Sequence, residues 1–497
     1  MRILYLDIDT LRPDHLGCYG YHRNTSPNID RLAHDGVRFD KCYVSDAPCL
    51  PSRASFFSGQ FGIHTGVVGH GGTAADMRLI GPGRTFSSMR LRPSLTWCMR
   101  LMEIYPVSFS PFAERHSAWW FCEGWREFTN PGRFGAENAD EVSKPAIDWI
   151  KANGERDNWF LHVNMWDPHT NYTTPKELAN AFADEPLEGW YTEEMRQRQW
   201  GGFGPGGPQE PGGNMGGDYR CPTMPNHIKS LADYKTWVDG YDRGIANADL
   251  WVGRILNALA DRGILDDTLI MVSSDHGENF GELGVIGDHA TADHITSRVP
   301  MILRHPRLGG GRVDDALHYQ TDVGATLVEL AGEVATSRWE GMHGTGGVVP
   351  ACWDGRSFAP ALKAGRSEGR PNVVFSQNAW SCQRSVRWDN YVFIRTYDTG
   401  LRGYPAHMLF DIAKDPHELN DLAPGRPDLV AHGRSLIAQW TDEMMRTNAS
   451  QIDPMWTVMA EGGPYHTRGK LESYCQRLRQ TGRAHHAEFL QAHPTGL

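Results

Sequence analysis

The chain has 497 residues, of which 40% are hydrophobic and 22% are charged, as is ordinary for a folded globular protein. This length exceeds what one hydrophobic core usually reaches, so we expect a large N-terminal domain and a smaller C-terminal one. The net charge of −11 at pH 7 argues against nucleic acid or an anionic membrane surface as a partner. An anionic substrate would therefore need a local basic site.

The start of the chain, its apolar runs and its cysteines bear on the compartment. Residues 1–7 read directly as a strand, with no charged-then-apolar leader before them. No run approaches the ~20 apolar residues of a membrane span. The nine cysteines are scattered without CxxC pairs, which is typical of reduced thiols. We expect a cytoplasmic protein with no membrane partner, or a periplasmic one if a leader has been removed.

Residues 3–9 form a short apolar run that ends in two carboxylates, Asp7 and Asp9. On a strand, residues two apart share a face. A buried parallel strand delivers such a side chain to the crevice at the carboxyl edge of an α/β sheet. The alternative for each carboxylate alone is a helix cap, because the residues that follow are turn-like.

Residues 47–59 place a single cysteine, Cys49, between two prolines and ahead of a short helix-like run. Pro51 suits the first turn of a helix, so Cys49 would lie at the helix N-terminus, where free backbone N–H groups favour an anion. Arg53, one turn later, points back toward the same place. The stretch predicts that Cys49 is positioned as a nucleophile that attacks a sulfate or phosphate ester. The alternative is a buried structural cysteine.

Two later segments frame the middle of the chain. Residues 159–166 are a second buried-strand candidate, and His169 follows just past the strand end. Residues 186–225 are rich in glycine and proline and cannot form a regular core element. They form either a flexible surface insertion or a loop that covers the substrate or forms a wall of its pocket.

Residues 241–262 have helical periodicity and precede a third buried strand at residues 268–274. A helix followed by an apolar strand is an α/β unit, so the sheet should be largely parallel. The strand ends in Asp275 and His276, for which the alternative is a capping aspartate beside a surface histidine. Beyond about residue 365 the pattern changes to short strands and then a helix, which indicates a small subdomain.

The five residues 49–53 (C-L-P-S-R) resemble the signature of the formylglycine-dependent sulfatases of the alkaline phosphatase superfamily. In that family this cysteine is oxidised to an aldehyde, formylglycine, by a maturation enzyme. Residues 25–33, 275–276 and 414–422 are also similar to family motifs.

The resemblance implies an α/β fold with a large mixed, mostly parallel sheet sandwiched by helices and a smaller C-terminal α+β subdomain. We expect the catalytic domain at residues 1–365, including the insertion at about 186–225. The subdomain, a small antiparallel sheet with a helix, would occupy residues 366–497.

By the same resemblance, Asp9, Asp275 and His276 bind a divalent metal. Calcium is the first choice, with manganese or magnesium as alternatives. Many sulfatases have a second aspartate directly after the first, where this chain has Thr10. This departure resembles the phosphonate monoester hydrolase and choline-sulfatase branches. Asp7 would lie behind the ligands.

The resemblance assigns catalysis to Cys49, Arg53, His169 and His289. One hydroxyl of the hydrated aldehyde attacks sulfur, Arg53 holds the diol, and His169 or His289 protonates the departing alcohol. His289 stands where many sulfatases have a lysine, eleven residues before Pro300.

The substrate-binding candidates are basic residues. Many sulfatases bind the sulfate with a Lys-Trp-His cluster, and this chain has Arg115 and His116 in that region. His70 lies in a loop rich in glycine and histidine, and His294 competes with the histidine at position 289. The alternative for each histidine is a structural or surface role.

We predict a sulfuric ester hydrolase that releases inorganic sulfate from a sulfated mono- or oligosaccharide. Such a substrate would derive from glycosaminoglycan or algal polysaccharide. One alternative is a phosphonate monoester or phosphodiester hydrolase of the same superfamily. Another is a catalytically silent binding protein on this fold.

Overall fold

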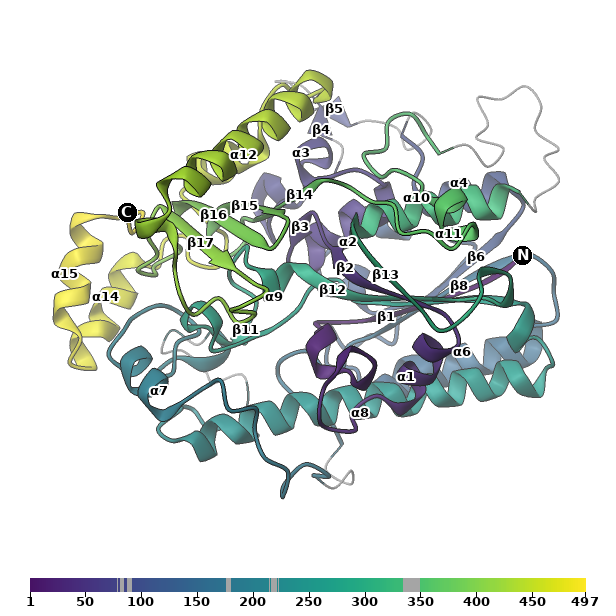
Figure 1. Ribbon diagram of the computed structural model, residues 1–497, viewed down its shortest axis with the longest axis horizontal. Coiled ribbons are helices and arrows are strands. Elements are labelled where there is room, and N and C mark those ends of the chain that lie inside the picture. The colour runs from purple at the N-terminus through teal and green to yellow at the C-terminus, as the bar shows by residue number, and fades with distance from the viewer. Residues whose placement is uncertain are drawn as a thin grey trace.

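Figure 1 shows the computed structural model, in which helices pack on a central sheet and a second, smaller sheet lies beside it. The structure describes residues 1–77, 79–80, 85–86, 92–175, 180–213, 215, 221, 223–333 and 349–497. Part of the predicted glycine- and proline-rich insertion, namely residues 214, 216–220 and 222, lies outside the described residues.

The central sheet has eight strands, and all its pairings are parallel except the two made by β12. In spatial order the strands are β13 (Arg312–Tyr319), β2 (Val37–Tyr43), β12 (Arg298–Arg304), β9 (Thr268–Ser273), β1 (Arg2–Ile8), β8 (Trp159–Met165), β6 (Tyr105–Phe109) and β7 (Glu127–Thr129). Asp7 pairs with Asn164 on one side and with Ser273 on the other. The carboxyl ends of β1, β8 and β9 are therefore level, and the predicted mixed, mostly parallel sheet is confirmed.

Alternate residues of β1 pack against two different helical layers. Leu4, Leu6 and Ile8 share a buried cluster with α1 (Pro27–His34), α6 (Ala139–Asn153) and α8 (Leu231–Asp261). Ile3 and Tyr5 share another cluster with α2 (Cys49–Ser58), α4 (Leu95–Leu101), α10 (Gln320–Gly332) and α11 (Ala359–Lys363). Successive side chains of a strand point to opposite faces, so the sheet is sandwiched by helices as predicted (Figure 1).

The second sheet has five strands in the order β17 (His407–Asp411), β16 (Tyr391–Asp398), β15 (Cys382–Trp388), β14 (Asn372–Gln377) and β3 (Asp46–Ala47). Strands β14 to β17 pair antiparallel, whereas β3 joins β14 in parallel through Asp46 and Ser376. Helix α12 (Pro427–Thr447) packs on this sheet. The sheet thus combines C-terminal strands with a strand two residues before Cys49, and the domain boundary near residue 365 stays a prediction.

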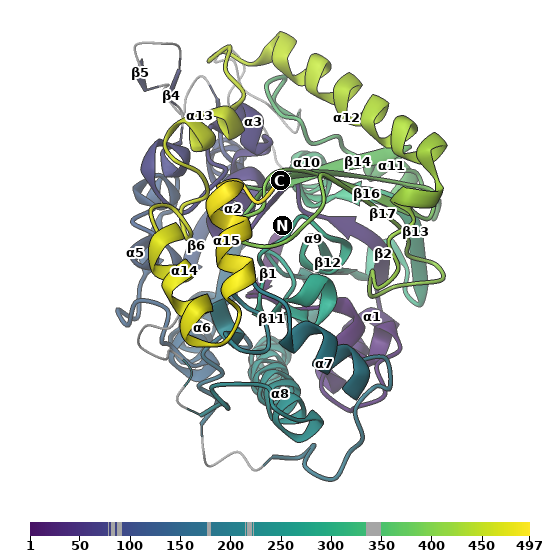
Figure 2. The same cartoon turned by 90° about the vertical axis from the view of Figure 1, so that its left-hand side faces the viewer.

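The C-terminal helices lie on the side of the molecule toward which β1 runs (Figures 1 and 2). The remaining elements are β4 (Leu79–Ile80), β5 (Thr85–Phe86), β10 (Asn279–Phe280), β11 (Ile286–Asp288), α3 (Gly62–Thr65), α5 (Phe112–Arg115), α7 (Glu193–Trp200), α9 (His294–Ser297), α13 (Pro454–Ala460), α14 (Leu471–Gln480) and α15 (Ala484–Ala492). Among the described residues, no helix combines the length and the apolar character that crossing a membrane requires.

Candidate active site

Cys49 is the first residue of α2, directly after the short strand β3 and Pro48. Every residue of α2 is buried, so the helix is fixed on all sides and its N-terminus is held under the carboxyl edge of the central sheet. The Sγ atom of Cys49 lies 3.1 Å from Nε2 of His276. The predicted helix start is present, and the cysteine faces the end of β9.

Cys49 and three other residues form a group of candidate metal ligands. One atom each from Asp9, Cys49, Asp275 and His276 lies within 4.8 Å of the others, and all four side chains are buried. His276 Nδ1 lies 2.8 Å from the carbonyl oxygen of Gly277. A carbonyl only accepts hydrogen bonds, so Nδ1 carries the proton and the lone pair of Nε2 is free to bind a metal.

The carboxylate of Asp9 is buried and lacks hydrogen bonds among the described residues. Within the described part of the chain, neither of its buried carboxylate oxygens has a hydrogen-bond partner, although Oδ2 lies 3.0 Å from Nη1 of Arg53. Burial and the negative charge of Asp275 raise the pKa of Asp9 well above its ordinary value. A buried carboxylate of this kind is costly unless a cation neutralises it. The donor set therefore fits a divalent metal.

Arg53 connects the carboxylates of the site. Its Nε and Nη2 donate to Asp7 at 2.8 and 3.1 Å, and its Nη1 donates to Asp275 at 2.6 Å. His162 Nε2 lies 3.2 Å from Asp7 Oδ2. Burial by itself raises the pKa of Asp7, but Arg53 and His162 lower it below its ordinary value. Asp7 is thus an ionised anchor for Arg53, behind the ligand candidates.

His289 is oriented by a carboxylate that the sequence analysis did not single out. Its Nδ1 lies 3.0 Å from Oε2 of Glu278, whose other oxygen accepts hydrogen bonds from Thr170 and Tyr172 at 2.7 and 3.0 Å. With Nδ1 engaged, Nε2 is left for the site, and His289, His276 and Cys49 form a group with ligand atoms within 4.8 Å. Burial lowers the pKa of His289, but Glu278 and Asp288 outweigh it and raise the pKa to about 9.

His169, the other candidate proton donor, lies at the same pocket. Its ring stacks on Trp166 with centroids 4.3 Å apart, and it lies 5.5 Å from the ring of His289. Its Nδ1 donates to the carbonyl oxygen of Thr170. Burial and the charge of Arg115 lower the pKa of His169 well below its ordinary value. No carboxylate contact among the described residues supports its protonated form.

A pocket of about 600 Å³ opens above Cys49. Predicted residues that line it are Cys49, His70, Arg115, His116, His169 and His289. The rings of His70 and His116 lie with centroids 5.0 Å apart, and the Nε2 atoms of both are buried without a hydrogen-bond partner among the described residues. These polar atoms and the guanidinium make the wall suitable for an anion.

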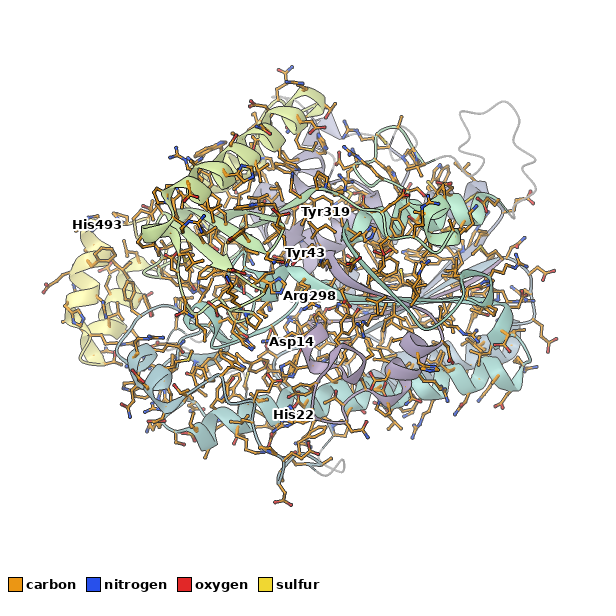
Figure 3. All side chains as sticks on the ribbon, in the orientation of Figure 1. Asp14, His22, Tyr43, Arg298, Tyr319 and His493 are labelled. Atoms are coloured by element: carbon orange, nitrogen blue, oxygen red, sulfur yellow. The ribbon has the colours of Figure 1, made fainter. Side chains whose placement is uncertain are left out.

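His294 lies apart from the other predicted substrate-binding residues. It is not among the described residues that line the pocket. Its Nδ1 lies 2.8 Å from the hydroxyl of Tyr43, which Figure 3 labels near the centre of the molecule. Its backbone N–H donates to Glu418 at 3.0 Å. His294 is the first residue of α9, and its ring makes a buried contact with the end of β2 in the central sheet.

The far wall of the pocket comes from the C-terminal region and was missed from sequence. Trp380, Tyr465 and His466 all line it. His466 stacks on Trp380 at 4.4 Å between centroids, and its Nε2 lies 2.8 Å from Nδ1 of His70. The two histidines are 396 residues apart in the chain, so no local pattern signals the contact.

The described part of the glycine- and proline-rich insertion is anchored to the C-terminal helices. Glu210 is buried and accepts a hydrogen bond from Arg483 Nη1 at 3.1 Å. Gly212 lines the pocket, and a Cβ added at Gly213 would lie 2.6 Å from Oδ2 of Asp288. Of the two interpretations left open, this part of the insertion fits a wall of the pocket.

Comparison with known proteins agrees with this geometry. The sequence profile of the family named Sulfatase matches residues 2–91 and 105–333, more than half of the chain. An N-acetylglucosamine-6-O-sulfatase of Bacteroides thetaiotaomicron is 22% identical over 532 aligned residues, covering 93% of this chain and 89% of the relative.

Two solved structures share the fold. A 2-O glycosaminoglycan sulfatase has a TM-score of 0.67 at 20% identity, over 89% of this chain and 92% of the other. A phosphonate monoester hydrolase from Silicibacter pomeroyi has a TM-score of 0.66 at 20% identity, over 92% of this chain and 97% of the other. With more than half of its length matched by the family profile, this chain belongs to the sulfatase family of the alkaline phosphatase superfamily, a family of sulfuric ester hydrolases.

Proposed function

We propose that this sulfuric ester hydrolase releases inorganic sulfate from a sulfated saccharide and uses formylglycine made from Cys49. The observation that carries the proposal is the position of Cys49, at the buried start of α2 and 3.1 Å from His276 beside two buried aspartates. The aspartates and His276 can hold a divalent metal, and Arg53 lies 2.6 Å from Asp275, so positive charge can be placed beside the nucleophile, as attack on an anionic ester needs.

The metal of this proposal is held by Asp9, Asp275 and His276. Carboxylate oxygens suit calcium, magnesium or manganese, and calcium is our first choice. A bound divalent ion supplies polarisation of a sulfate oxygen and a lowered pKa for a neighbouring hydroxyl. The backbone N–H of Thr10, which stands where many relatives have a second aspartate, donates to Asp275 Oδ1 at 3.1 Å and fixes that ligand.

The conversion of Cys49 to formylglycine requires a maturation enzyme, which is the one protein partner we propose. When hydrated, the aldehyde supplies the attacking oxygen. Arg53 holds positive charge at the bottom of the site, because Asp7 fixes two of its nitrogens and leaves Nη1 toward Asp275. The negative charge of the reacting ester is thereby balanced by a group that does not have to move.

His289 holds the proton for the departing alcohol at Nε2. Glu278 fixes the ring through Nδ1 at 3.0 Å, so the other ring nitrogen, Nε2, is left for the group formed with Cys49 and His276. An alkoxide is a poor leaving group, and a positioned proton donor lets it depart as the neutral alcohol. His169 is the second candidate for the proton donor, since it lines the same pocket.

The saccharide part of the proposal is supported by the pocket and by the relatives. Arg115, His70 and His116 offer contacts for an anion, and aromatic side chains lie farther out. The relative from Bacteroides thetaiotaomicron is named for an aminosugar sulfate, and the first solved structure for glycosaminoglycan. We also propose cytoplasmic action on imported saccharides, because the nine cysteines are scattered through the sequence without CxxC pairs, which is typical of proteins of reducing compartments.

A second candidate is phosphonate monoester or phosphodiester hydrolysis. Thr10 in place of a second aspartate and the likeness to a phosphonate monoester hydrolase favour it. Sulfate, phosphonate and phosphodiester groups are all tetrahedral anions, so the site geometry suits each of them.

The test compares substrates on one enzyme produced together with a formylglycine-generating enzyme. Sulfated mono- and disaccharides are assayed for free sulfate, beside an aryl phosphonate monoester and a diaryl phosphodiester. We expect sulfate release to have the highest kcat/KM and to vanish in Cys49→Ala. The matched control is Cys98→Ala, another fully buried cysteine, which should keep its activity. Faster turnover of the phosphonate or phosphodiester would overturn the proposal in favour of the second candidate.

A further inference from the structure

Two large aromatic side chains that line the pocket are exposed. Phe134 is 66% exposed and Tyr465 is 45% exposed, and both belong to the pocket that contains Cys49. Single exposed apolar side chains are common and need no explanation. A pair of them in one cavity, where the rest of the lining is largely basic or polar, indicates a surface for a ligand with an apolar face.

Tyr465 is held in position by the loop below it. A Cβ added at Gly71 would lie 2.1 Å from Cε2 of Tyr465, so the ring lies directly against the glycine backbone. The next residue, His466, donates its backbone N–H to the carbonyl of Ala379 at 2.9 Å and contacts His70 at 2.8 Å. One face of the tyrosine ring is thus covered by loop backbone while much of the ring stays in contact with solvent.

Phe134 is anchored through its backbone. Its carbonyl oxygen accepts a hydrogen bond from Nη1 of Arg115 at 3.3 Å. The guanidinium of Arg115 in turn lies 3.8 Å above the ring centre of Trp166. The main chain at Phe134 is therefore tied to the basic wall of the pocket, while its side chain projects into solvent.

The exposure of the lining residues divides the pocket into a buried inner part at Cys49 and a solvent-exposed outer part with Phe134 and Tyr465. The inner part, with Cys49 and Arg115, suits the sulfate group and the sugar that carries it. The volume of about 600 Å³ falls in the range of pockets that enclose a drug-sized molecule, which is larger than one sugar ring. Sugar rings present C–H faces that pack on aromatic rings, whose large flat surfaces lose little side-chain entropy on binding.

We infer that Phe134 and Tyr465 bind the sugar ring next to the sulfated one, so the enzyme prefers a sulfated disaccharide to the matching sulfated monosaccharide. The inference rests on the proposed hydrolysis of saccharide sulfates and specifies its substrate class. Tyr465 lies beyond residue 333, the last residue that the family profile matches, so this contact lies outside the matched part of the chain.

The test uses matched pairs of substrates. Each pair consists of a sulfated monosaccharide and a disaccharide that contains the same sulfated sugar, and the pairs differ in whether the sulfate is at the 2-O, 4-O or 6-O position. We expect about tenfold lower KM for the disaccharide of the active pair. Phe134→Ala and Tyr465→Ala should each raise the KM for the disaccharide about five- to tenfold, as truncation of an aromatic contact typically does. Neither variant should change the KM for the monosaccharide or the kcat for either substrate. Tyr465→Phe should keep the preference.

Two controls separate this inference from general effects. Trp119→Ala alters a similarly exposed aromatic residue, at 58%, that is not among the described residues lining the pocket, and it should change neither KM. Calorimetric binding of each saccharide pair to the Cys49→Ala protein measures the same preference without turnover. Equal affinity for both members of every pair would overturn the inference, as would variants that weaken both members equally.

The two proposals fail differently. A protein that releases no sulfate but still binds disaccharides more tightly through Phe134 and Tyr465 would contradict the proposed function and support the aromatic contact. A protein that releases sulfate equally well from both members of each pair would support the function and contradict the contact.

Discussion

Arg53 and Asp7 form a two-bond ion pair at the bottom of the site, with Nε 2.8 Å from Oδ2 and Nη2 3.1 Å from Oδ1. Both side chains are buried. Because two of the guanidinium nitrogens are held in this way, the third faces the carboxylates of Asp9 and Asp275 at 3.0 and 2.6 Å. Asp7 is therefore a positioning residue that acts through Arg53.

Replacing Asp7 with asparagine should weaken this orientation. We expect Asp7→Asn to lower kcat about 10- to 100-fold, as loss of a group that orients catalytic side chains does. It should also lower the free energy of unfolding, since Arg53 loses one charged partner, although Asp9 and Asp275 still face its Nη1 at 3.0 and 2.6 Å. The matched control is Asp453→Asn, which breaks another buried two-bond pair, with Arg384, at 2.7 and 3.1 Å. The control should lose stability and keep kcat, and an Asp7 variant with full kcat would contradict the assignment.

Metal binding at Asp9 should stabilise the folded protein. A metal that binds only the folded state at 100 times its dissociation constant stabilises that state by about 2.7 kcal/mol. We expect calcium, manganese or magnesium to raise the melting temperature of the wild type and not of Asp9→Asn. Without metal the variant should be at least as stable as wild type, because it removes a buried carboxylate that has no hydrogen bond among the described residues.

Asp314→Asn is the control for this measurement. Asp314 is also fully buried, and its Oδ2 has no hydrogen-bond partner among the described residues, but it lies beside His318 on β13, away from the candidate ligands. This variant should keep the metal-induced rise in melting temperature. An unchanged rise in the Asp9 variant would show that the metal binds elsewhere.

The proton donor can be identified by its dependence on the leaving group. We expect His289→Gln to slow hydrolysis of sugar sulfates by about 10²- to 10⁴-fold, the usual contribution of a positioned acid. Aryl sulfates, whose phenolate departs without a proton, should lose far less. His169→Gln is the comparison, since that residue lines the same pocket without a carboxylate contact among the described residues. If it showed the stronger leaving-group dependence, the two roles would be exchanged.

The residues at strand ends could be predicted from sequence because apolar runs locate the strands and parallel strands end at one edge. Asp9 and the Asp275–His276 pair follow β1 and β9, which are neighbours in the sheet. The helix that begins at Cys49 could likewise be predicted from the sequence, because Pro51 suits the first turn of a helix.

Contacts between loops could not be predicted, because side-chain pairing across the fold has no periodicity in the sequence. Glu278 and His289 are an example, since the loop geometry alone brings them to 3.0 Å. His294 is a related case. Its nearness in the chain made it a competitor of His289, but the sequence does not show that its ring contacts Tyr43.

Glu282 provides a pH-dependent test of the packing beside the site. It is fully buried, with Oε1 3.0 Å from Arg12 Nη2 and 3.0 Å from His417 Nδ1. Burial by itself raises the pKa of Glu282, but Arg12 and His417 outweigh it and lower the pKa from 4.5 to about 2. A lowered carboxylate pKa stabilises the fold above pH 4.5, and this contribution is lost as the pH falls from 4.5 toward 2.

Glu282→Gln should therefore lower the free energy of unfolding by about 3 kcal/mol at pH 7, from the size of the pKa shift. The difference between variant and wild type should shrink below pH 4.5, which urea unfolding at pH 7, 5 and 3.5 can measure. A difference that stays constant over this range would mean that the glutamate is not ionised against Arg12.

Peptide mass spectrometry over Cys49 tests the central claim most directly. The protein is produced together with a formylglycine-generating enzyme, digested, and examined for the residue at position 49. We predict the mass change for conversion of the thiol to an aldehyde, in proportion to the sulfatase activity of each preparation. A preparation that hydrolyses sulfate esters while Cys49 remains entirely a thiol would contradict the account.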